Sequence, residues 1–173
     1  MWIRRRFRVV ALDIRTFGDP VLKSRAAPVK EFDEPLERLA EEMLVTMREH
    51  EGVGLAANQV GRLKRILVAA VEDEEFVIAN PVIEDRSEET AKEVEGCLSI
   101  PGIHVGVERP TGITISGSDA SGEPLRMEVT GLLARVFQHE VDHLDGVTIL
   151  ERTDRESRKA AMRELRERLL AQS

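Results

Sequence analysis

The sequence has a single cysteine, Cys97, so no disulfide can form within the chain, and we expect the protein to work in a reducing cytoplasm. It also lacks any uninterrupted apolar run of membrane-spanning length, which argues against a membrane protein. Acidic residues outnumber basic ones and give a formal net charge of −7, which argues against DNA binding and other general nucleic-acid binding. A chain of 173 residues without an internal repeat fits one domain, and we expect a monomer.

The start of the chain is basic but does not read as a secretory signal. Residues 1–8 include four arginines, and the apolar stretch at residues 9–12 ends at Asp13. That stretch is too short for the apolar region of a signal peptide. We interpret residues 1–13 as an N-terminal extension or a misassigned start, with an organellar targeting segment as the alternative.

Residues 138–146 read Gln-His-Glu-Val-Asp-His-Leu-Asp-Gly and contain the pattern His-Glu-x-x-His. On an α-helix, residues four apart share a face, so His139 and His143 can present two imidazole nitrogens to one metal ion. Glu140 would lie beside the ion and could take a proton from water, the central step of metal-assisted hydrolysis. Two histidines at this spacing also occur by chance on solvated helices. Here the apolar spacing predicts a buried helix that stops at Gly146, where unpaired imidazoles would be costly.

The third ligand decides the class of enzyme. A metzincin protease would need a histidine at position 149, where this chain has Ile149. A gluzincin protease would use a downstream glutamate, for which Glu156, Glu164 and Glu167 are the candidates, although the intervening chain is short for that architecture. We favour Cys97, because it lies in the turn-rich sequence Gly-Cys-Leu-Ser-Ile-Pro-Gly and its thiolate would complete the two-histidine site.

A third segment, residues 51–61, is rich in small residues that allow another backbone to approach closely. Its Gly-x-Gly is not a Rossmann nucleotide fingerprint. The third glycine is missing at the required spacing, and the segment follows a predicted helix instead of a strand.

Three separated motifs therefore stand out: Gly-Val-Gly-Leu-Ala-Ala-Asn-Gln at residues 52–59, Glu-Gly-Cys-Leu-Ser at residues 95–99, and the histidine segment at residues 138–146. In this order they resemble the motifs of the peptide deformylase family. Residues 14–22 also resemble the opening of that family, so the resemblance extends from about residue 14 to about residue 150. It implies a catalytic domain over residues 14–152 with an α+β fold, in which mainly antiparallel sheets surround a central metal-binding helix.

The resemblance also implies a metal centre. Cys97, His139 and His143 would hold one divalent ion with a position left open for water, and Glu140 would act as the general base and then as the general acid. Fe²⁺ is the ion we expect in the cell. A thiolate and two imidazoles also suit Zn²⁺, Ni²⁺ and Co²⁺, and the order of metal affinities alone does not decide between them.

The implied substrate is the N-formylmethionine end of a new polypeptide, which would yield formate and a free amino terminus. The side-chain amide of Gln59 and the backbone N–H of Leu98 would donate hydrogen bonds to the oxyanion that forms on the formyl group. Removing one such donor typically lowers turnover by about 10²–10³-fold.

Substrate contacts follow from the same resemblance. The backbone around Val53 and Gly54, together with Gly96, would hydrogen-bond the peptide, and apolar groups near Val53 and Leu132 would receive the methionine side chain. Relatives often have an apolar residue at the position of Arg135, so we expect its aliphatic stem to line the pocket and its charge to point outward.

Two further expectations concern the loop that carries the cysteine. Glu95 should form an ion pair with Arg109 beneath the metal loop and so fix it. His104 stands where some relatives carry arginine at the rim of the site, and we interpret it as a surface or strand histidine and not as a ligand.

The remaining elements are read from periodicity. Helical spacing of apolar residues predicts a core helix over residues 34–50, capped by Asp33. Strands are predicted at residues 66–71, 76–84, 103–108, 111–117 and 125–129. The acidic stretches at residues 72–75 and 84–95 are interpreted as solvated loops.

Residues 153–173 form a separate, strongly charged C-terminal segment. A narrow apolar stripe at Ala161, Met162, Leu165 and Leu169 predicts a helix docked lightly on the domain. By the family resemblance, this helix could instead contact the ribosome near the tunnel exit.

Two rival functions remain at this point. One is a zinc peptidase that uses the two histidines and a distal glutamate. The other is a non-catalytic protein with a structural metal site, which requires a fourth protein ligand that closes the coordination sphere.

Overall fold

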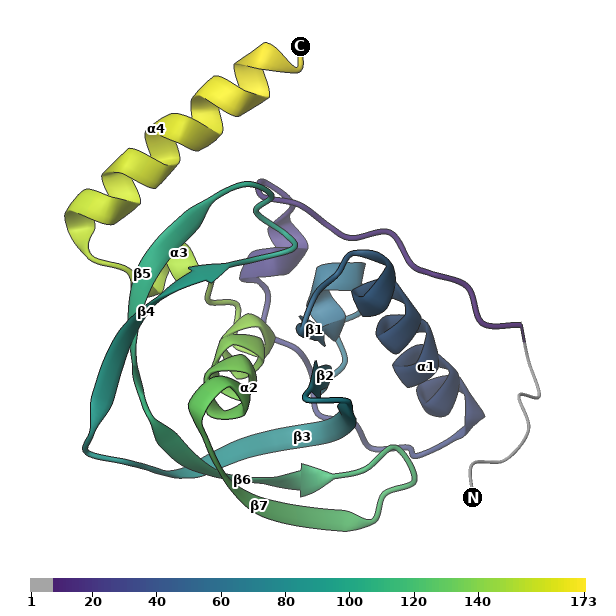
Figure 1. Cartoon of the computed structure of the whole chain (residues 1–173). Helices are drawn as coiled ribbons and strands as arrows, with labels where there is room; N and C mark the ends of the chain where they lie inside the picture. The colour runs from purple at the N-terminus through teal and green to yellow at the C-terminus, as the bar shows by residue number, and fades with distance from the viewer. Residues whose placement is uncertain (1–7) are drawn as a thin grey trace.

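The helix that carries the His-Glu-x-x-His pattern, α2 (Gly131–Leu144), lies at the centre of the computed structural model, with strands on several sides of it (Figure 1). The structure describes residues 8–173, so most of the basic N-terminal segment lies outside the described residues. The helices are α1 (Glu34–Glu49), α2, α3 (Ile149–Arg152) and α4 (Arg155–Ala171), with short 3-10 helices η1 (Pro20–Lys23) and η2 (Ala57–Val60). None of these helices is long and apolar enough to cross a membrane.

Two antiparallel sheets build the rest of the fold. The first has five strands in the order β1-β2-β3-β6-β7, and the second pairs β4 with β5. The strands are β1 (Gly54–Ala56), β2 (Ile66–Val71), β3 (Glu74–Arg86), β4 (Thr90–Gly96), β5 (His104–Pro110), β6 (Gly112–Ser118) and β7 (Pro124–Thr130). The predicted α+β fold with mainly antiparallel sheets around a central helix is confirmed.

The first predicted helix is confirmed as α1. Asp33 caps it, because its carboxylate accepts a hydrogen bond from the backbone N–H of Leu36 at 3.1 Å. Leu36, Met43 and Met47 are fully buried and pack against strand β2 and its neighbours. This packing holds α1 beside β1, so the chain that leaves the helix enters the glycine-rich segment next to α2.

The interpretation of residues 84–95 as a solvated loop is wrong, because most of this stretch is strand. β4 pairs with β5 from Thr90 opposite Pro110 to Gly96 opposite His104. The hydrophobic signal is absent because Glu95 is the only buried residue of β4. In the other acidic stretch, Glu72 and Asp73 do form the turn between β2 and β3, both with positive φ, whereas residues 74 and 75 already belong to β3.

α2 is held by its apolar face. Phe137, Ala134 and Leu144 are fully buried against the five-stranded sheet, and the rings of Phe137 and Phe76 meet edge to face at 5.6 Å. After the helix, Gly146 has φ +77°, the left-handed conformation that ends a helix, as predicted. The buried face fixes the rotation of α2 and thereby the direction of its histidines.

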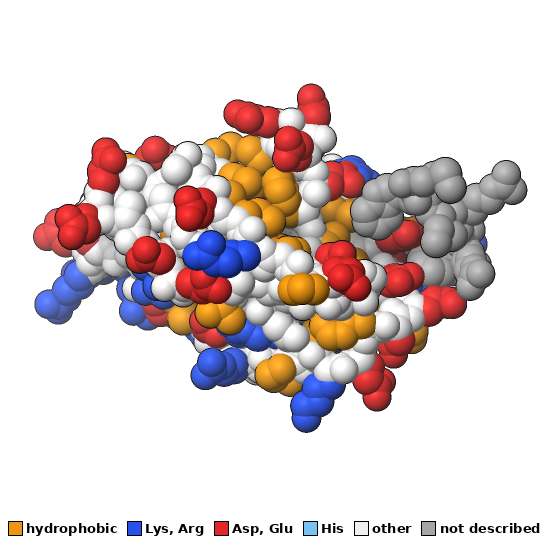
Figure 2. Space-filling view, turned by 90° about the horizontal axis from the view of Figure 1, so that it is seen from below, with side chains coloured by type: hydrophobic (Ala, Val, Ile, Leu, Met, Phe, Trp, Pro, Cys, Tyr) orange, Lys and Arg blue, Asp and Glu red, His pale blue; other side chains and the backbone are white. Residues whose placement is uncertain are grey.

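Charged side chains are spread over the face of the molecule that Figure 2 shows. Figure 2 shows one face of the molecule, on which acidic side chains are scattered around a central hydrophobic patch and basic side chains lie between them. This distribution agrees with the modest negative net charge of the whole chain.

Candidate functional site

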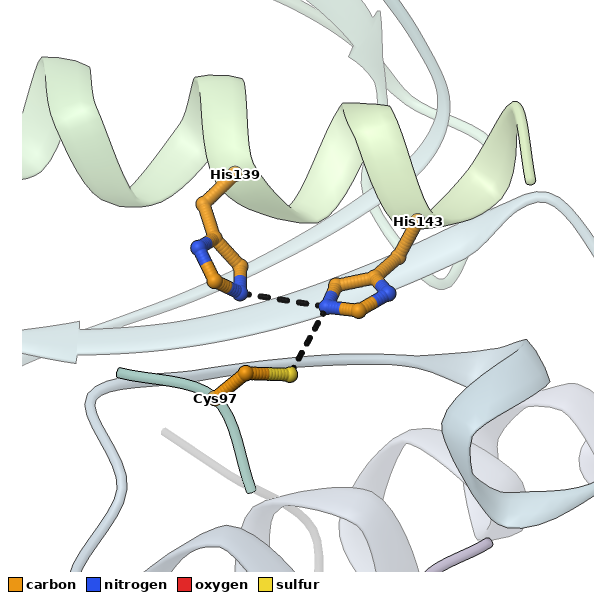
Figure 3. A group of neighbouring side chains, drawn as sticks. All are labelled: Cys97, His139 and His143. Atoms are coloured by element: carbon orange, nitrogen blue, oxygen red, sulfur yellow. Dashed lines mark hydrogen bonds between the residues drawn. The ribbon is translucent and has the colours of Figure 1, made fainter. Parts of the chain in front are cut away.

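Cys97, His139 and His143 come together, as the motif pattern implied (Figure 3). The two histidines project from successive turns of α2 toward the loop that follows β4, where the cysteine lies. Nε2 of His143 is 3.2 Å from the Cys97 sulfur and 3.1 Å from Nε2 of His139. The candidate ligand atoms of all three residues lie within 4.8 Å of one another. One cysteine sulfur and two imidazole nitrogens thus converge on a single point.

Glu95 fixes the orientation of the His139 ring. Its Oε2 is 3.0 Å from Nδ1 of His139, which leaves Nε2 of that ring to face the cysteine. Arg109 holds the same carboxylate with two hydrogen bonds, from Nε to Oε1 at 2.5 Å and from Nη2 to Oε2 at 3.0 Å. Burial would raise the pKa of Glu95, but the hydrogen bonds from His139 and Arg109 lower it to about 2. The carboxylate is therefore ionised at neutral pH.

The expected outward direction of the Arg135 charge is wrong. Its side chain is buried, and Nη1 donates to Glu95 Oε1 at 2.8 Å and to the backbone oxygen of Val107 at 2.9 Å. Nη2 donates to the backbone oxygen of Ala91 at 2.8 Å. A buried carboxylate and two carbonyl oxygens attract the guanidinium inward, so Arg135 ties α2 to both strands of the β4–β5 hairpin.

The sequence reading missed Asp142 and Arg152, which extend this network. Asp142 accepts a hydrogen bond from Arg109 at 2.9 Å and is held at both carboxylate oxygens by Arg152. Asn58 was also missed, although it belongs to the first motif. It is fully buried and its side-chain amide donates to the backbone oxygen of His143. A polar residue on the buried face of a predicted helix was the available signal for Asp142.

Glu140 lies against β1 beside the ligand group. A Cβ atom at Gly54 would lie 2.6 Å from Oε1 of Glu140 and 2.8 Å from Cγ1 of Val136, so the glycine is needed for this close approach. Burial raises the pKa of Glu140 to about 7, against the opposing effect of His139. Within the described residues, Oε2 of Glu140 is buried without a hydrogen-bond partner. A carboxyl group with a pKa near neutrality can both accept and release a proton.

The side chain of Gln59 is held in one orientation. Its Oε1 accepts from the backbone N–H of Ala56 at 2.9 Å, so Nε2 faces the cysteine loop, 3.2 Å from Ser99 Oγ and 3.7 Å from the Cys97 sulfur. Leu98, the next residue of that loop, packs closely against Gly52. The amide of Gln59 and the backbone of Leu98 therefore flank the cysteine.

A cavity of about 560 Å³ opens next to this group. It is lined by every predicted substrate-contacting residue and by the rim histidine, namely Val53, Gly54, Gly96, Leu132, Arg135 and His104. Val53 and Leu132 remain about half exposed there. His104 is the first residue of β5, in agreement with its interpretation as a strand histidine.

The described residues do not support the rival sites. The group that could hold a metal comprises Cys97, His139 and His143, without a fourth ligand among residues 8–173. Of the distal glutamates, Glu164 is exposed on α4 and pairs with Arg168 at 2.7 Å. A divalent ion held by these three residues alone would keep a coordination position open, which is typical of a catalytic site.

Comparison with known proteins agrees with this geometry. The family described as "Polypeptide deformylase" matches residues 11–159. The chain belongs to the polypeptide deformylase family. It is 49% identical over 142 residues to a peptide deformylase of Natranaerobius thermophilus, covering 82% of this chain and 91% of the relative. It is 48% identical over 154 residues to peptide deformylase 1 of Corynebacterium glutamicum, covering 87% and 91%.

Solved deformylase structures share the fold. The Thermus thermophilus enzyme superposes with a TM-score of 0.88 at 44% identity, over 93% of this chain and 96% of that one. The Thermotoga maritima enzyme superposes with a TM-score of 0.82 at 46% identity, over 83% and 98%. The resemblance inferred from the three motifs is therefore confirmed.

The buried ion pair beneath the metal loop yields a prediction. Arg109→Ala should lower metal affinity or turnover by about 10- to 100-fold, because the residues that orient metal ligands typically have effects of this size. Titration with a chelator and steady-state kinetics measure the two quantities. Arg126→Ala is the matched control, since it breaks an exposed pair with Glu84 on the outer sheet. Equal metal affinity and turnover in both variants would contradict the prediction.

Proposed function

We propose that Cys97, His139 and His143 hold the divalent ion of this enzyme and that Glu140 moves the protons of its reaction. As a member of the deformylase family, the chain is a metal-dependent hydrolase that removes the N-terminal formyl group from nascent peptides. The observation that carries the residue assignment is the convergence of three donor atoms within 4.8 Å beside a buried carboxylate with an unpartnered oxygen.

The residues present fit a divalent ion. A thiolate and two imidazoles suit first-row transition metals, and the unpartnered oxygen of Glu140 is placed to accept a hydrogen bond from a water molecule. When bound, such an ion polarises the formyl carbonyl and lowers the pKa of water. We propose Fe²⁺ as the ion in the cell, with Zn²⁺, Ni²⁺ and Co²⁺ as alternatives that the donor set also accepts.

Glu140 would transfer protons in both halves of the hydrolysis. Its carboxylate takes a proton from water while the water oxygen bonds to the formyl carbon. The carbon–nitrogen bond then breaks, and the same carboxyl group returns the proton to the departing nitrogen. The products are formate and a peptide with a free amino terminus. A pKa near neutrality, caused by burial, suits this double role.

Gln59 and Leu98 would stabilise the negative charge that develops on the formyl oxygen. The Gln59 amide is already oriented by Ala56 and Ser99, so its donor needs no rearrangement during the reaction. The backbone N–H of Leu98 is the second donor in this proposal.

The peptide would lie in the cavity as an added strand. The backbone of Val53 and Gly54 lies on one side and Gly96, at the end of β4, on the other, so both could hydrogen-bond an extended substrate. The methionine side chain would rest against Val53, Leu132 and the stem of Arg135.

We also propose an oligomeric state, a compartment and a partner for the enzyme. We propose that the enzyme is a monomer. We also propose that it is cytoplasmic, because its essential thiolate requires a reducing compartment. Residues 14–152 would form the catalytic domain. α4 would contact the ribosome near the tunnel exit, which fits a helix whose Leu169 and Leu170 remain 52% and 67% exposed.

Formate release from a formyl-methionine peptide tests the function. Metal analysis of protein purified without oxygen, paired with that assay, identifies the ion and connects it with activity. Protein that carries metal but releases no formate would refute the proposal.

A further inference from the structure

The C-terminal helix packs against the rim of the substrate cavity. Ala161 and Leu165 of α4 are buried in one hydrophobic cluster with Ile100 and Ile103, and Cys97 packs against the same cluster. Residues 101–104 line the cavity. Figure 1 shows α4 on the outside of β5, on the side away from α1. The helix is thus attached to the segment that forms one lip of the cavity.

Arg168 of α4 reaches that lip. A Cβ atom at Gly102, which lines the cavity, would lie 2.7 Å from Nη1 and 2.9 Å from Cζ of Arg168. Gly102 also has φ +77°, a conformation that other residues rarely adopt. The guanidinium therefore lies directly over the glycine, in space that any other residue at 102 would occupy.

The Arg168 guanidinium has N–H donors available over Gly102. Nε and Nη2 both donate to Oε1 of Glu164, at 3.0 and 2.7 Å, whereas Nη1 is the nitrogen that lies over Gly102. The Arg168 side chain is 48% exposed. Arginine carries five N–H donors, and the pair with Glu164 uses only two of its three nitrogens.

The two lips of the cavity differ in charge. Arg168, which lies over Gly102, and His104 lie at one lip, while His50 and Glu51, which follow α1, lie at the other. A peptide that leaves the metal group between these lips passes the Arg168 guanidinium on one side and the Glu51 carboxylate on the other. An acidic side chain that points to the Gly102 lip would pair with Arg168, and a basic one would be repelled.

We propose that Arg168 is a specificity-determining residue that favours substrates with an acidic side chain beyond the second residue. We assign the preference to later residues of the substrate because the formyl group would lie at the metal group and the methionine side chain would lie in the pocket of Val53 and Leu132. The inference rests on the proposed deformylase function of this cavity. It gives α4 a role in substrate selection that a lightly docked, solvated helix would not have.

The test is a set of formylated peptides. Formyl-methionine is followed by alanines, with one Glu or one Lys placed at the second, third or fourth residue, and kcat and KM are measured for each peptide. The wild-type protein should prefer Glu over Lys by about two- to fivefold at the third or fourth residue, the size expected of an exposed ion pair. The preference should appear in KM and decrease with added salt.

Variants test whether Arg168 causes the preference for Glu over Lys. Arg168→Ala should abolish it, Arg168→Glu should reverse it, and Arg168→Lys should retain its sign. Arg163→Ala is the matched control, because this exposed arginine lies on the side of α4 opposite Leu165. Metal content and thermal unfolding confirm that each variant is folded.

Different outcomes would overturn the role of Arg168 and the proposed deformylase function. Formate release from the alanine peptide without any Glu preference, or a preference that survives in Arg168→Ala, would overturn the role of Arg168 alone. An equal loss of kcat on all peptides in Arg168→Ala would also overturn it, since that indicates a structural effect. No formate from any peptide would overturn the proposed function itself.

Discussion

Replacing Glu140 by alanine should leave the metal bound and lower kcat by about 10²–10⁴-fold, the contribution typical of a general acid–base residue. The reason is that Glu140 lies beside the ligand group without belonging to it. Metal content per protein and formate release, measured on the same preparation, check both halves of this expectation.

His139→Ala is the comparison for that variant. It removes a ligand nitrogen, so metal and activity should be lost together. If Glu140→Ala lost metal to the same extent as His139→Ala, the carboxylate would be a ligand, and its assigned role in proton transfer would be wrong.

Cys97→Ala should lose metal and activity together. The thiolate supplies one of only three donors in the group, and the alanine side chain cannot coordinate. Oxidation of the sulfur should likewise inactivate the wild-type protein, because a sulfinic or sulfonic acid no longer offers the thiolate.

Cys97→Ser sharpens this experiment, since it preserves the size of the side chain but replaces the thiolate by a weak hydroxyl ligand. Thr90→Ala, an exposed change at the other end of β4, is the control for effects on the hairpin. Full metal occupancy in Cys97→Ala would indicate a different third ligand, as in the peptidase alternative.

The parts of the fold that could be predicted have a strong local signal. The apolar spacing predicted α1 with bounds close to those observed and predicted a helix that stops at Gly146, and the apolar strand at residues 66–71 was predicted with the bounds of β2. The metal group was predictable because two of its members lie on one helix at ligand spacing. The third member, Cys97, was favoured from its turn-rich sequence beside a two-histidine site that lacked a ligand, and the family resemblance supported the same residue.

The parts that could not be predicted depend on tertiary contacts. β4 is a polar strand whose only buried residue, Glu95, is stabilised by Arg109 from the next strand. The inward direction of Arg135 depends on the same carboxylate and on carbonyl oxygens of two strands. No local pattern of residues reports such a network, because its members are 14 to 44 positions apart in the chain.

Formate release from a formyl-methionyl tripeptide by the metal-loaded protein tests the central claim most directly. The account predicts one formate for each free amino terminus, with the peptide bonds intact. Cleavage of a peptide bond without formate would instead indicate a peptidase, and tightly bound metal without any hydrolysis would indicate a structural site.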